Sequence, residues 1–228
     1  MIETFPTAEA AAAAAADAVV AQLAPPGPKR LLVTGGRGPG PVYDRLARAD
    51  LDWGRVTVTL SDDRFVAPDA AESNERLVRE RLLQGPAAAA AFVPLKGQGP
   101  TPADDAEAAE PAIRALLPFD AALLGMGPDG HIASLFPGTP GVDGLLAPDA
   151  ARCVVGVDVA GFAPYLPRIS LTGRALFASR LILLLVGGEA KRALIERTAT
   201  DPSFAPPVSA LMRQTVSPVR ILWSPGDA

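Results

Sequence analysis

The chain has 228 residues, 49% of them hydrophobic, and a formal net charge of −4 at pH 7. This length and apolar content suit one α/β domain over residues 1–228 with a packed core. The acidic balance and the lack of a basic block argue against a nucleic-acid-binding protein. The one cysteine, Cys153, excludes an intramolecular disulfide and favours a reducing cytoplasm.

An alanine-rich segment predicts a helix over residues 7–24 that packs on this domain. Alanine is the strongest helix former, Thr7 is a suitable N-cap, and the run Pro25-Pro26-Gly27 ends the helix. Unlike a signal peptide, the segment has acidic residues and no basic start, and it is too short and polar to cross a bilayer. We therefore expect no membrane partner.

Beyond this helix, strand and helix patterns alternate. We predict strands at residues 30–34, 56–60, 92–93, 119–124, 153–157, 181–186 and 219–223. We predict helices at residues 42–49, 74–83, 103–116 and 188–199, with a short one after the segment around residue 131. The alternation predicts a mainly parallel, Rossmann-like sheet with helices on both faces.

Three polar or glycine-rich segments directly follow predicted strands. They are Gly35-Gly36, Asp62-Asp63-Arg64 and Asp129-Gly130-His131. In a parallel α/β sheet, ligands bind at the carboxyl ends of the strands. We therefore expect these segments to meet in one site.

The segment around His131 carries the clearest chemical signal. It holds the only histidine of the chain, a residue type whose ordinary pKa near neutrality suits it to proton transfer. Asp129 can orient the imidazole or shape the turn, and Gly127 and Gly130 allow the backbone to approach a ligand closely. The alternative is a strand-to-helix loop whose histidine only packs or caps.

Residues 125–138 read Gly-Met-Gly-Pro-Asp-Gly-His-Ile-Ala-Ser-Leu-Phe-Pro-Gly, which resembles the signature of the 6-phosphogluconolactonases. This family lies in a wider group with glucosamine-6-phosphate deaminase. The resemblance implies the fold of the deaminase/ribose-5-phosphate isomerase group. It also implies hydrolysis of 6-phospho-D-glucono-1,5-lactone to 6-phosphogluconate in the oxidative pentose phosphate pathway, with a small sugar-phosphate substrate and no cofactor.

Residues 35–40 form a glycine-rich turn between a strand and a helix. Such a turn exposes backbone N–H groups and a helix N-terminus, which together favour a phosphate. The lactonases usually read Gly-Gly-Ser-Thr-Pro here, whereas this chain has Arg37 and Gly38 after Gly35 and Gly36. We expect this turn to bind substrate, with the Arg37 guanidinium in place of a hydroxyl. The alternatives are a tight turn that simply needs glycine and an Arg37 that points to solvent.

The run Asp62-Asp63-Arg64 resembles the family's Asp-Glu-Arg. Arg64 is expected to bind a phosphate or to stabilise negative charge on an attacked carbonyl. Asp62 is expected to orient either Arg64 or His131. A surface ion-pair cluster is the alternative. The downstream Ser73-Asn74 also matches the family, but a helix cap explains it equally well.

Two further cations are assigned by resemblance alone. The segments around Arg168 and Lys191 resemble the family's Arg-Ile/Val-Thr-Leu-Thr and Gly-x-x-Lys, where related deaminases hold the sugar phosphate. Solvated surface charges are the alternative. The chain departs from the family at residues 161–167, which lack the usual lysine, and at Phe177, where asparagine is usual.

The expected mechanism uses one histidine twice. His131 takes a proton from water as general base and returns it to the departing ring oxygen as general acid. No covalent intermediate is expected, because Ser134 lies outside a Gly-x-Ser-x-Gly elbow. We also expect no metal, because one histidine and scattered carboxylates give no ligand spacing, and we expect a monomer or a weak homodimer.

Two rival functions remain open at the level of sequence. An amino-sugar phosphate deaminase or isomerase typically continues Ile-Ala-Phe-Asn-Glu-Pro after the histidine, whereas residues 132–137 here read Ile-Ala-Ser-Leu-Phe-Pro. A non-catalytic sugar-phosphate sensor usually carries a DNA-binding helix, and the sequence has no basic recognition helix.

Overall fold

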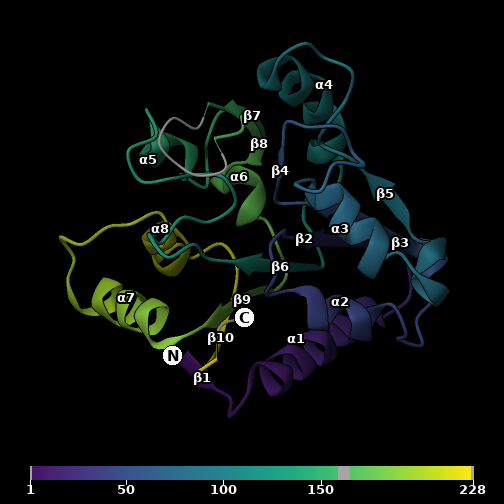
Figure 1. The fold of residues 1–228 in the computed structure, drawn as a ribbon, viewed down its shortest axis with the longest axis horizontal. Coiled ribbons are helices and arrows are strands. Elements are labelled where there is room, and N and C mark those ends of the chain that lie inside the picture. The colour runs from purple at the N-terminus through teal and green to yellow at the C-terminus, as the bar shows by residue number, and fades with distance from the viewer. Residues whose placement is uncertain (1, 159–164, 227–228) are drawn as a thin grey trace.

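The computed structural model of the chain describes residues 2–158 and 165–226 (Figure 1). The strands are β1 (Ile2–Thr4), β2 (Lys29–Val33), β3 (Val56–Leu60), β4 (Asp62–Arg64), β5 (Ala91–Val93), β6 (Ala121–Gly125), β7 (Val154–Val157), β8 (Arg168–Leu171), β9 (Ile182–Gly187) and β10 (Val219–Ser224). The helices are α1 (Ala8–Leu23), α2 (Gly40–Leu46), α3 (Asn74–Arg81), α4 (Pro102–Ala115), α5 (Val142–Leu145), α6 (Gly173–Leu176), α7 (Glu189–Thr200) and α8 (Val208–Arg213). Short 3₁₀ turns occupy Trp53–Arg55 and Gly85–Ala89.

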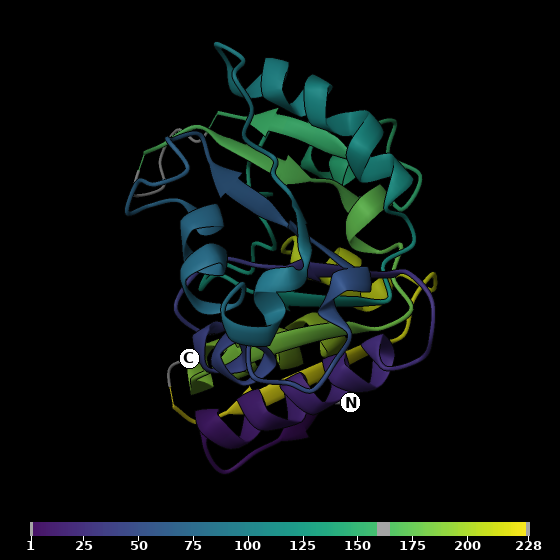
Figure 2. The same cartoon turned by 90° about the vertical axis from the view of Figure 1, so that its right-hand side faces the viewer.

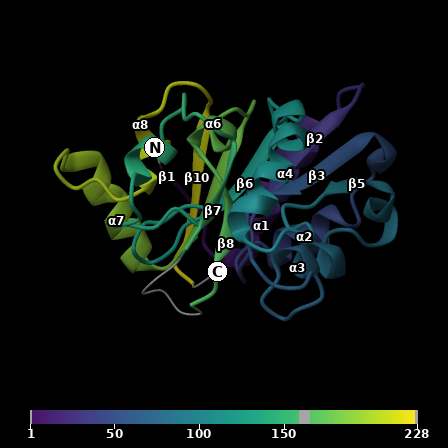
Figure 3. The ribbon, with the colours of Figure 1, turned by 90° about the horizontal axis from the view of Figure 1, so that it is seen from above.

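Seven strands form one parallel sheet in the order β1-β10-β9-β6-β2-β3-β5. Its central strands are continuous apolar runs, and Leu32, Leu123 and Leu184 are fully buried. Such runs are typical of parallel strands covered on both faces. Seen from above, α7 and α8 lie on the β10 side of the molecule, and β3 and β5 lie on the other (Figure 3). The predicted mainly parallel sheet is confirmed.

The strand order reverses between β2 and β6. From β2 the chain continues outward to β3 and β5, whereas from β6 it continues to β9 and β10 on the opposite side. The connections after β2 and β6 therefore leave in opposite directions and open a crevice at the carboxyl ends of these two strands.

Helix α1 covers one face of the sheet, at the bottom of Figure 2. The Thr7 hydroxyl accepts a hydrogen bond from Ala10 N at 3.1 Å, as a helix N-cap does. The helix packs against α2 and against β10, β9 and β6. Five of its seven buried residues are alanine, and such small side chains let the helix backbone lie close to the sheet. The alanine-rich helix is thus a packed element of the fold.

A second, three-stranded antiparallel sheet in the order β4-β8-β7 was not predicted from the sequence. It forms a separate layer above the main sheet, with α4 packed on β7 and β8 (Figure 2). Gly156 permits this close approach, because a Cβ there would lie 2.6 Å from Ala103 N. The run Asp62-Asp63-Arg64 is therefore a strand of this sheet, and the strand predicted at 153–157 belongs to it too.

Other differences from the predicted elements concern short segments. β1, β8, α6 and α8 were not predicted, and they span only 3, 4, 4 and 6 residues. The predicted short helix corresponds to α5, a single turn that begins well after His131. Elements this short carry too little periodic pattern to be recognised.

Of the segments in which the sequence departs from the family, residues 161–164 lie outside the described residues. Within the described residues, no helix combines the length and the apolar character that a membrane span requires.

Candidate active site

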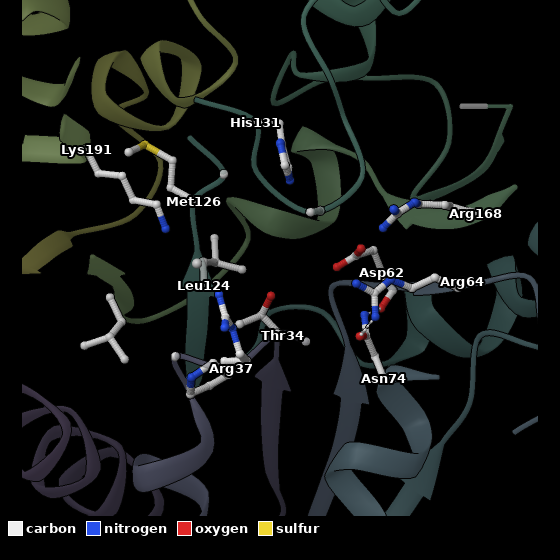
Figure 4. Close-up of a pocket in the computed structure, with 18 residues that line it drawn as sticks. Thr34, Arg37, Asp62, Arg64, Asn74, Leu124, Met126, His131, Arg168 and Lys191 are labelled. Atoms are coloured by element: carbon white, nitrogen blue, oxygen red, sulfur yellow. Dashed lines mark hydrogen bonds between the residues drawn. The ribbon is translucent and has the colours of Figure 1, made fainter. Parts of the chain in front are cut away.

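A cavity of about 250 Å³ lies at the carboxyl ends of β2, β3 and β6 (Figure 4). The loops after these strands supply most of its wall, Arg168 enters from β8, and Lys191 enters from the first turn of α7. The polar and charged lining residues are Thr34, Arg37, Asp62, Arg64, Asn74, His131, Arg168 and Lys191. The cavity thus gathers four cationic side chains, one carboxylate and the only histidine.

The His131 ring is held by Asp129. Nδ1 of His131 lies 2.6 Å from Oδ1 of Asp129, and the same carboxylate oxygen accepts from the His131 backbone N–H at 3.2 Å. The ring also packs on Phe136, with 4.3 Å between ring centroids. Because a carboxylate only accepts hydrogen bonds, Nδ1 carries the ring proton in the neutral imidazole, which leaves Nε2 as an acceptor.

The charge of Asp129 is set by two opposing effects. Burial disfavours the ionised carboxylate, but the hydrogen bond and the charge interaction with His131 outweigh burial and lower the pKa of Asp129 below its usual value. Asp129 is the carboxylate that contacts the His131 ring, whereas the Asp62 carboxylate accepts from the hydroxyls of Ser61 and Ser134.

The two glycines of this loop have different surroundings. A Cβ on Gly127 would lie 2.1 Å from Cε1 of His131, so only glycine leaves room for the ring. Gly130 has φ +83° and faces Pro206, away from the cavity, and its carbonyl accepts from Val208 N at 2.9 Å. Gly130, predicted to contact substrate, is not among the residues that line the cavity. It shapes the loop instead.

Arg64 and Arg168 stand directly opposite each other on β4 and β8. Like charges placed opposite across two strands repel each other. Each guanidinium has a buried Nε that finds no hydrogen-bond partner among the described residues. Two such cations facing one cavity favour an anionic ligand, which would supply the missing acceptors.

Arg168 is the more buried of the two, only 6% exposed. Its guanidinium lies over the Phe136 ring, 5.4 Å from the centroid. Burial lowers the pKa of Arg168 below its ordinary value and the charge of Arg64 adds to this, while Asp62 and Asp63 oppose it. An arginine remains protonated in spite of such a shift, so Arg168 is a buried positive charge at the cavity wall.

Asn74, for which the sequence left a family match and a helix cap as equal explanations, lines the cavity. Its Oδ1 accepts from Nη1 of Arg64 at 2.8 Å, and its Nδ2 donates to the carbonyl of Asp62 at 2.8 Å. A Cβ on Gly35 would lie 1.9 Å from Oδ1 of Asn74, so this glycine makes room for the amide. The family match at Ser73-Asn74 was the signal that could have found it.

The two aspartates of the run play different parts. Asp62 lines the cavity and accepts from the hydroxyls of Ser61 and Ser134. Asp63 is 1% exposed and accepts from Asn74 N at 2.7 Å and from Ser73 Oγ at 3.3 Å. Asp62 therefore belongs to the site, whereas Asp63 caps the start of α3.

Gly36, Arg37 and Lys191 complete the lining on the β2 and α7 side of the cavity. Gly36 has φ +90°, a backbone conformation that favours glycine. In Figure 4, Arg37 and Lys191 lie on the side of the cavity opposite Arg64 and Arg168. No group of three or more histidine, cysteine, aspartate or glutamate side chains within residues 2–158 and 165–226 is arranged to hold a metal ion.

Comparison with known proteins places the chain in a family. Residues 5–223 match the family described as glucosamine-6-phosphate isomerases/6-phosphogluconolactonase. The chain belongs to this family. A 6-phosphogluconolactonase of Caulobacter vibrioides is 46% identical to it, over 95% of this chain and 92% of the relative.

Solved structures agree with this membership. A crystal structure of a 6-phosphogluconolactonase from Shewanella baltica aligns with a TM-score of 0.91 and 33% identity, over 98% of this chain and 97% of the other. A monomeric glucosamine-6-phosphate deaminase aligns with a TM-score of 0.79 at 20% identity, which shows the shared fold. The predicted family and fold group are confirmed.

Family membership makes the loop after β2 informative. Where the lactonases usually carry serine and threonine, this chain carries Arg37 and Gly38, and both line the cavity. The Arg37 side chain is exposed at the cavity mouth. The Arg37 guanidinium is therefore one of the four cations of this cavity.

Proposed function

We propose that this protein hydrolyses 6-phospho-D-glucono-1,5-lactone to 6-phosphogluconate, with His131 as the general base. One observation carries the proposal: an imidazole fixed by a carboxylate at 2.6 Å, beside a cavity that gathers four cations. The lactonase names of relatives at 46% and 38% identity support the reaction class.

One imidazole can carry out both proton transfers that the reaction requires. Water must lose a proton as its oxygen attacks the lactone carbonyl, and the ring oxygen must gain one as the C–O bond breaks. Nε2 of His131 accepts the first proton and returns it to the ring oxygen. Asp129 stabilises the imidazolium that exists between these two steps.

The cations match the anionic groups of the substrate and of the intermediate. The 6-phosphate is charged throughout, and the carbonyl oxygen becomes negative when water adds. We assign Arg168, Lys191 and Arg37 to the phosphate, and Arg64 to the developing oxyanion. Losing a phosphate ligand should mainly raise KM, and losing the oxyanion ligand should mainly lower kcat.

The test is turnover of the lactone, generated in situ, by the native protein and by His131→Ala, beside the uncatalysed background. We expect the variant to lose about 10²–10⁴-fold in kcat with KM within a few-fold, because general base catalysis contributes that much. The unfolding temperature of the variant serves as the control for folding. Full activity in the variant rules out the histidine mechanism.

The same assay separates the rival functions. If the native protein hydrolyses no lactone above background but releases ammonia from glucosamine 6-phosphate, it is a deaminase. A protein that binds 6-phosphogluconate but turns over neither compound is a sensor.

A further inference from the structure

A buried network of hydroxyl groups joins the His131 loop to the strand ends beneath it. Ser134 Oγ donates to Oδ2 of Asp62 at 2.6 Å, and Ser134 N donates to Ser170 Oγ at 3.1 Å. Ser61 Oγ donates to the other oxygen of Asp62, Oδ1, at 2.8 Å. All three serines are fully buried. The Asp62 carboxylate is thus held by the β3 end on one side and by the His131 loop on the other.

The loop itself is tightly bent around His131. The His131 carbonyl accepts from Gly127 N at 2.9 Å, and a turn follows in which Leu135 N donates to the carbonyl of Ile132 at 3.1 Å. Ala133, inside this turn, has φ +49°, the one positive φ of a non-glycine residue in the described chain. That conformation costs an L-residue about 1–2 kcal/mol and persists only where the surroundings enforce it.

Ser134 follows Ala133 directly and is hydrogen-bonded to two other segments of the fold. Its backbone and its side chain are both anchored, one to β8 through Ser170 and the other to the β3–β4 corner through Asp62. His131 lies three residues before these anchors and makes no hydrogen bond to either of them. Ser134 thus fixes the chain three residues after His131.

We propose that Ser134 is a positioning residue for His131, acting through its hydrogen bonds to Asp62 and Ser170. The inference rests on the proposed function, because it assigns Ser134 a part in the proton transfers of His131. A general base must lie within about 3.2 Å of the proton it removes, and a displacement of about 1 Å costs roughly 10²-fold in rate. In this arrangement Ser134 is no nucleophile, since its side chain is fully buried and is not among the residues that line the cavity.

The chain offers a matched control in Ser61. Ser61 and Ser134 are equally buried, and each donates to one oxygen of the same carboxylate. Either alanine variant leaves that buried carboxylate one donor short, which destabilises a protein by about 1–3 kcal/mol. Only Ser134 belongs to the His131 loop, so only its loss should move the ring.

The experiment compares Ser134→Ala with Ser61→Ala in lactone turnover. We expect Ser134→Ala to lower kcat about 10–100-fold with KM within three-fold, and Ser61→Ala to keep kcat within two-fold, at similar losses in unfolding temperature. Ser134→Cys, nearly isosteric but a weak donor, should fall between serine and alanine. Equal losses of kcat in the two alanine variants, or a native kcat in Ser134→Ala, overturn the proposal.

A second readout is independent of turnover. Because His131 is the only histidine, the protein labelled with ¹⁵N-histidine gives a single imidazole signal pair in NMR. Ser134→Ala should shift or broaden that signal, and Ser61→Ala should leave it in place. If the native protein hydrolyses no lactone, the proposed function fails, and this spectrum still decides whether Ser134 positions the ring. A native imidazole spectrum in Ser134→Ala overturns the positioning role.

Discussion

At the scale of single residues, the groups that face the cavity are held by partners behind them. Asp129 holds the ring of His131, and Asn74 holds the guanidinium of Arg64. Glycine at 127 leaves space for the ring. A group fixed before the substrate arrives loses less conformational freedom on binding, which lowers the barrier to reaction.

Asp129→Asn tests the electrostatic part of this arrangement. The pKa of Asp129 lies below its ordinary value, so the carboxylate is charged at neutral pH and favours the protonated imidazole. The amide keeps the shape but loses the charge. We expect kcat to fall about 10²-fold, because the amide cannot stabilise the imidazolium that forms during proton transfer.

The pH profile of stability supplies the check on this variant. A carboxyl whose folded-state pKa is depressed contributes stability above its unfolded pKa, and this contribution is lost as pH falls through the folded pKa. Asp129→Asn should therefore be less stable than the native protein at neutral pH, with a gap that narrows in acid. A native kcat in Asp129→Asn would show that the charge of Asp129 does not act on His131.

Arg168→Met tests whether the pair formed by Arg64 and Arg168 favours ligand binding but destabilises the unliganded protein. The substitution removes a buried cation that faces Arg64, so we expect the unliganded protein to gain about 1 kcal/mol. Activity should fall, with kcat/KM about 10²-fold lower, because a charge-assisted contact to the substrate is lost. Thermal unfolding and kinetics measure the two effects.

The matched control for this variant is Arg174→Met. Arg174 lies outside the cavity lining and donates to the carbonyls of Ala150 and Asp149. Its loss should reduce stability and leave kcat/KM unchanged. A fall in stability for both variants would refute the view that the arginine pair is electrostatically strained.

At the scale of elements, β4 and α3 support each other at the edge of the site. Ser73 caps α3 through Arg76 N at 3.2 Å, and Asp63 of β4 accepts from the backbone N–H groups of Asn74 and Glu75 at 2.7 and 3.1 Å. The start of α3, which carries Asn74, is therefore fixed by the strand that carries Arg64.

Asp63→Asn measures this support. An amide supplies one acceptor where the carboxyl supplies two, so we expect a loss of about 1–2 kcal/mol in the free energy of unfolding. Burial raises the pKa of Asp63 to about 6, against the pull of the backbone N–H groups of Asn74, Glu75 and Arg64.

The raised pKa gives the variant a pH signature. The unfolded chain releases the Asp63 proton near pH 4, and the folded chain releases it near pH 6. The stability contributed by this group is therefore complete at low pH and declines as pH rises through that window. Denaturant unfolding should show a larger difference between native and Asp63→Asn at about pH 4 than at pH 7, and a difference that grows with pH would contradict it.

At the scale of the whole molecule, the cavity lies between two layers, the seven-stranded parallel sheet and the three-stranded antiparallel sheet. Thr34 and His131 come from the carboxyl edge of the parallel sheet, whereas Arg64 and Arg168 come from the antiparallel one. A ligand that contacts both groups joins the two layers, and its binding energy adds to the stability of the folded state.

The product 6-phosphogluconate should accordingly stabilise both layers. At a concentration of 100 times Kd, mass action predicts about 2.7 kcal/mol of added stability. Hydrogen exchange should slow at β8 as well as at the loop after β2, and Arg168→Met should lose the protection at β8. Protection confined to the parallel sheet would place the ligand outside the arginine pair.

Much of the parallel sheet and the identity of the histidine loop were predictable from the sequence. Strands β6 and β9 are short, continuous apolar runs, which is the pattern typical of parallel strands that are buried on both faces. Family membership likewise followed from fourteen contiguous residues around His131.

The partners of the site residues were not predictable in the same way. Sequence left open whether Asp62 or Asp129 contacts His131, and it offered no reason to place Arg64 opposite Arg168, 104 positions apart. That pairing depends on the register of β4 against β8. The register of such short strands is set by which of their side chains must be buried in the packed core.

The sequence by itself determined the longer local elements, because turn residues, caps and apolar periodicity act between neighbours along the chain. The tertiary structure alone decided that Gly130 faces Pro206, that Ser134 bonds to Asp62, and that Arg64 and Arg168 lie on one wall of the cavity. These contacts join residues distant in the chain, and their geometry exists only after both sheets have packed.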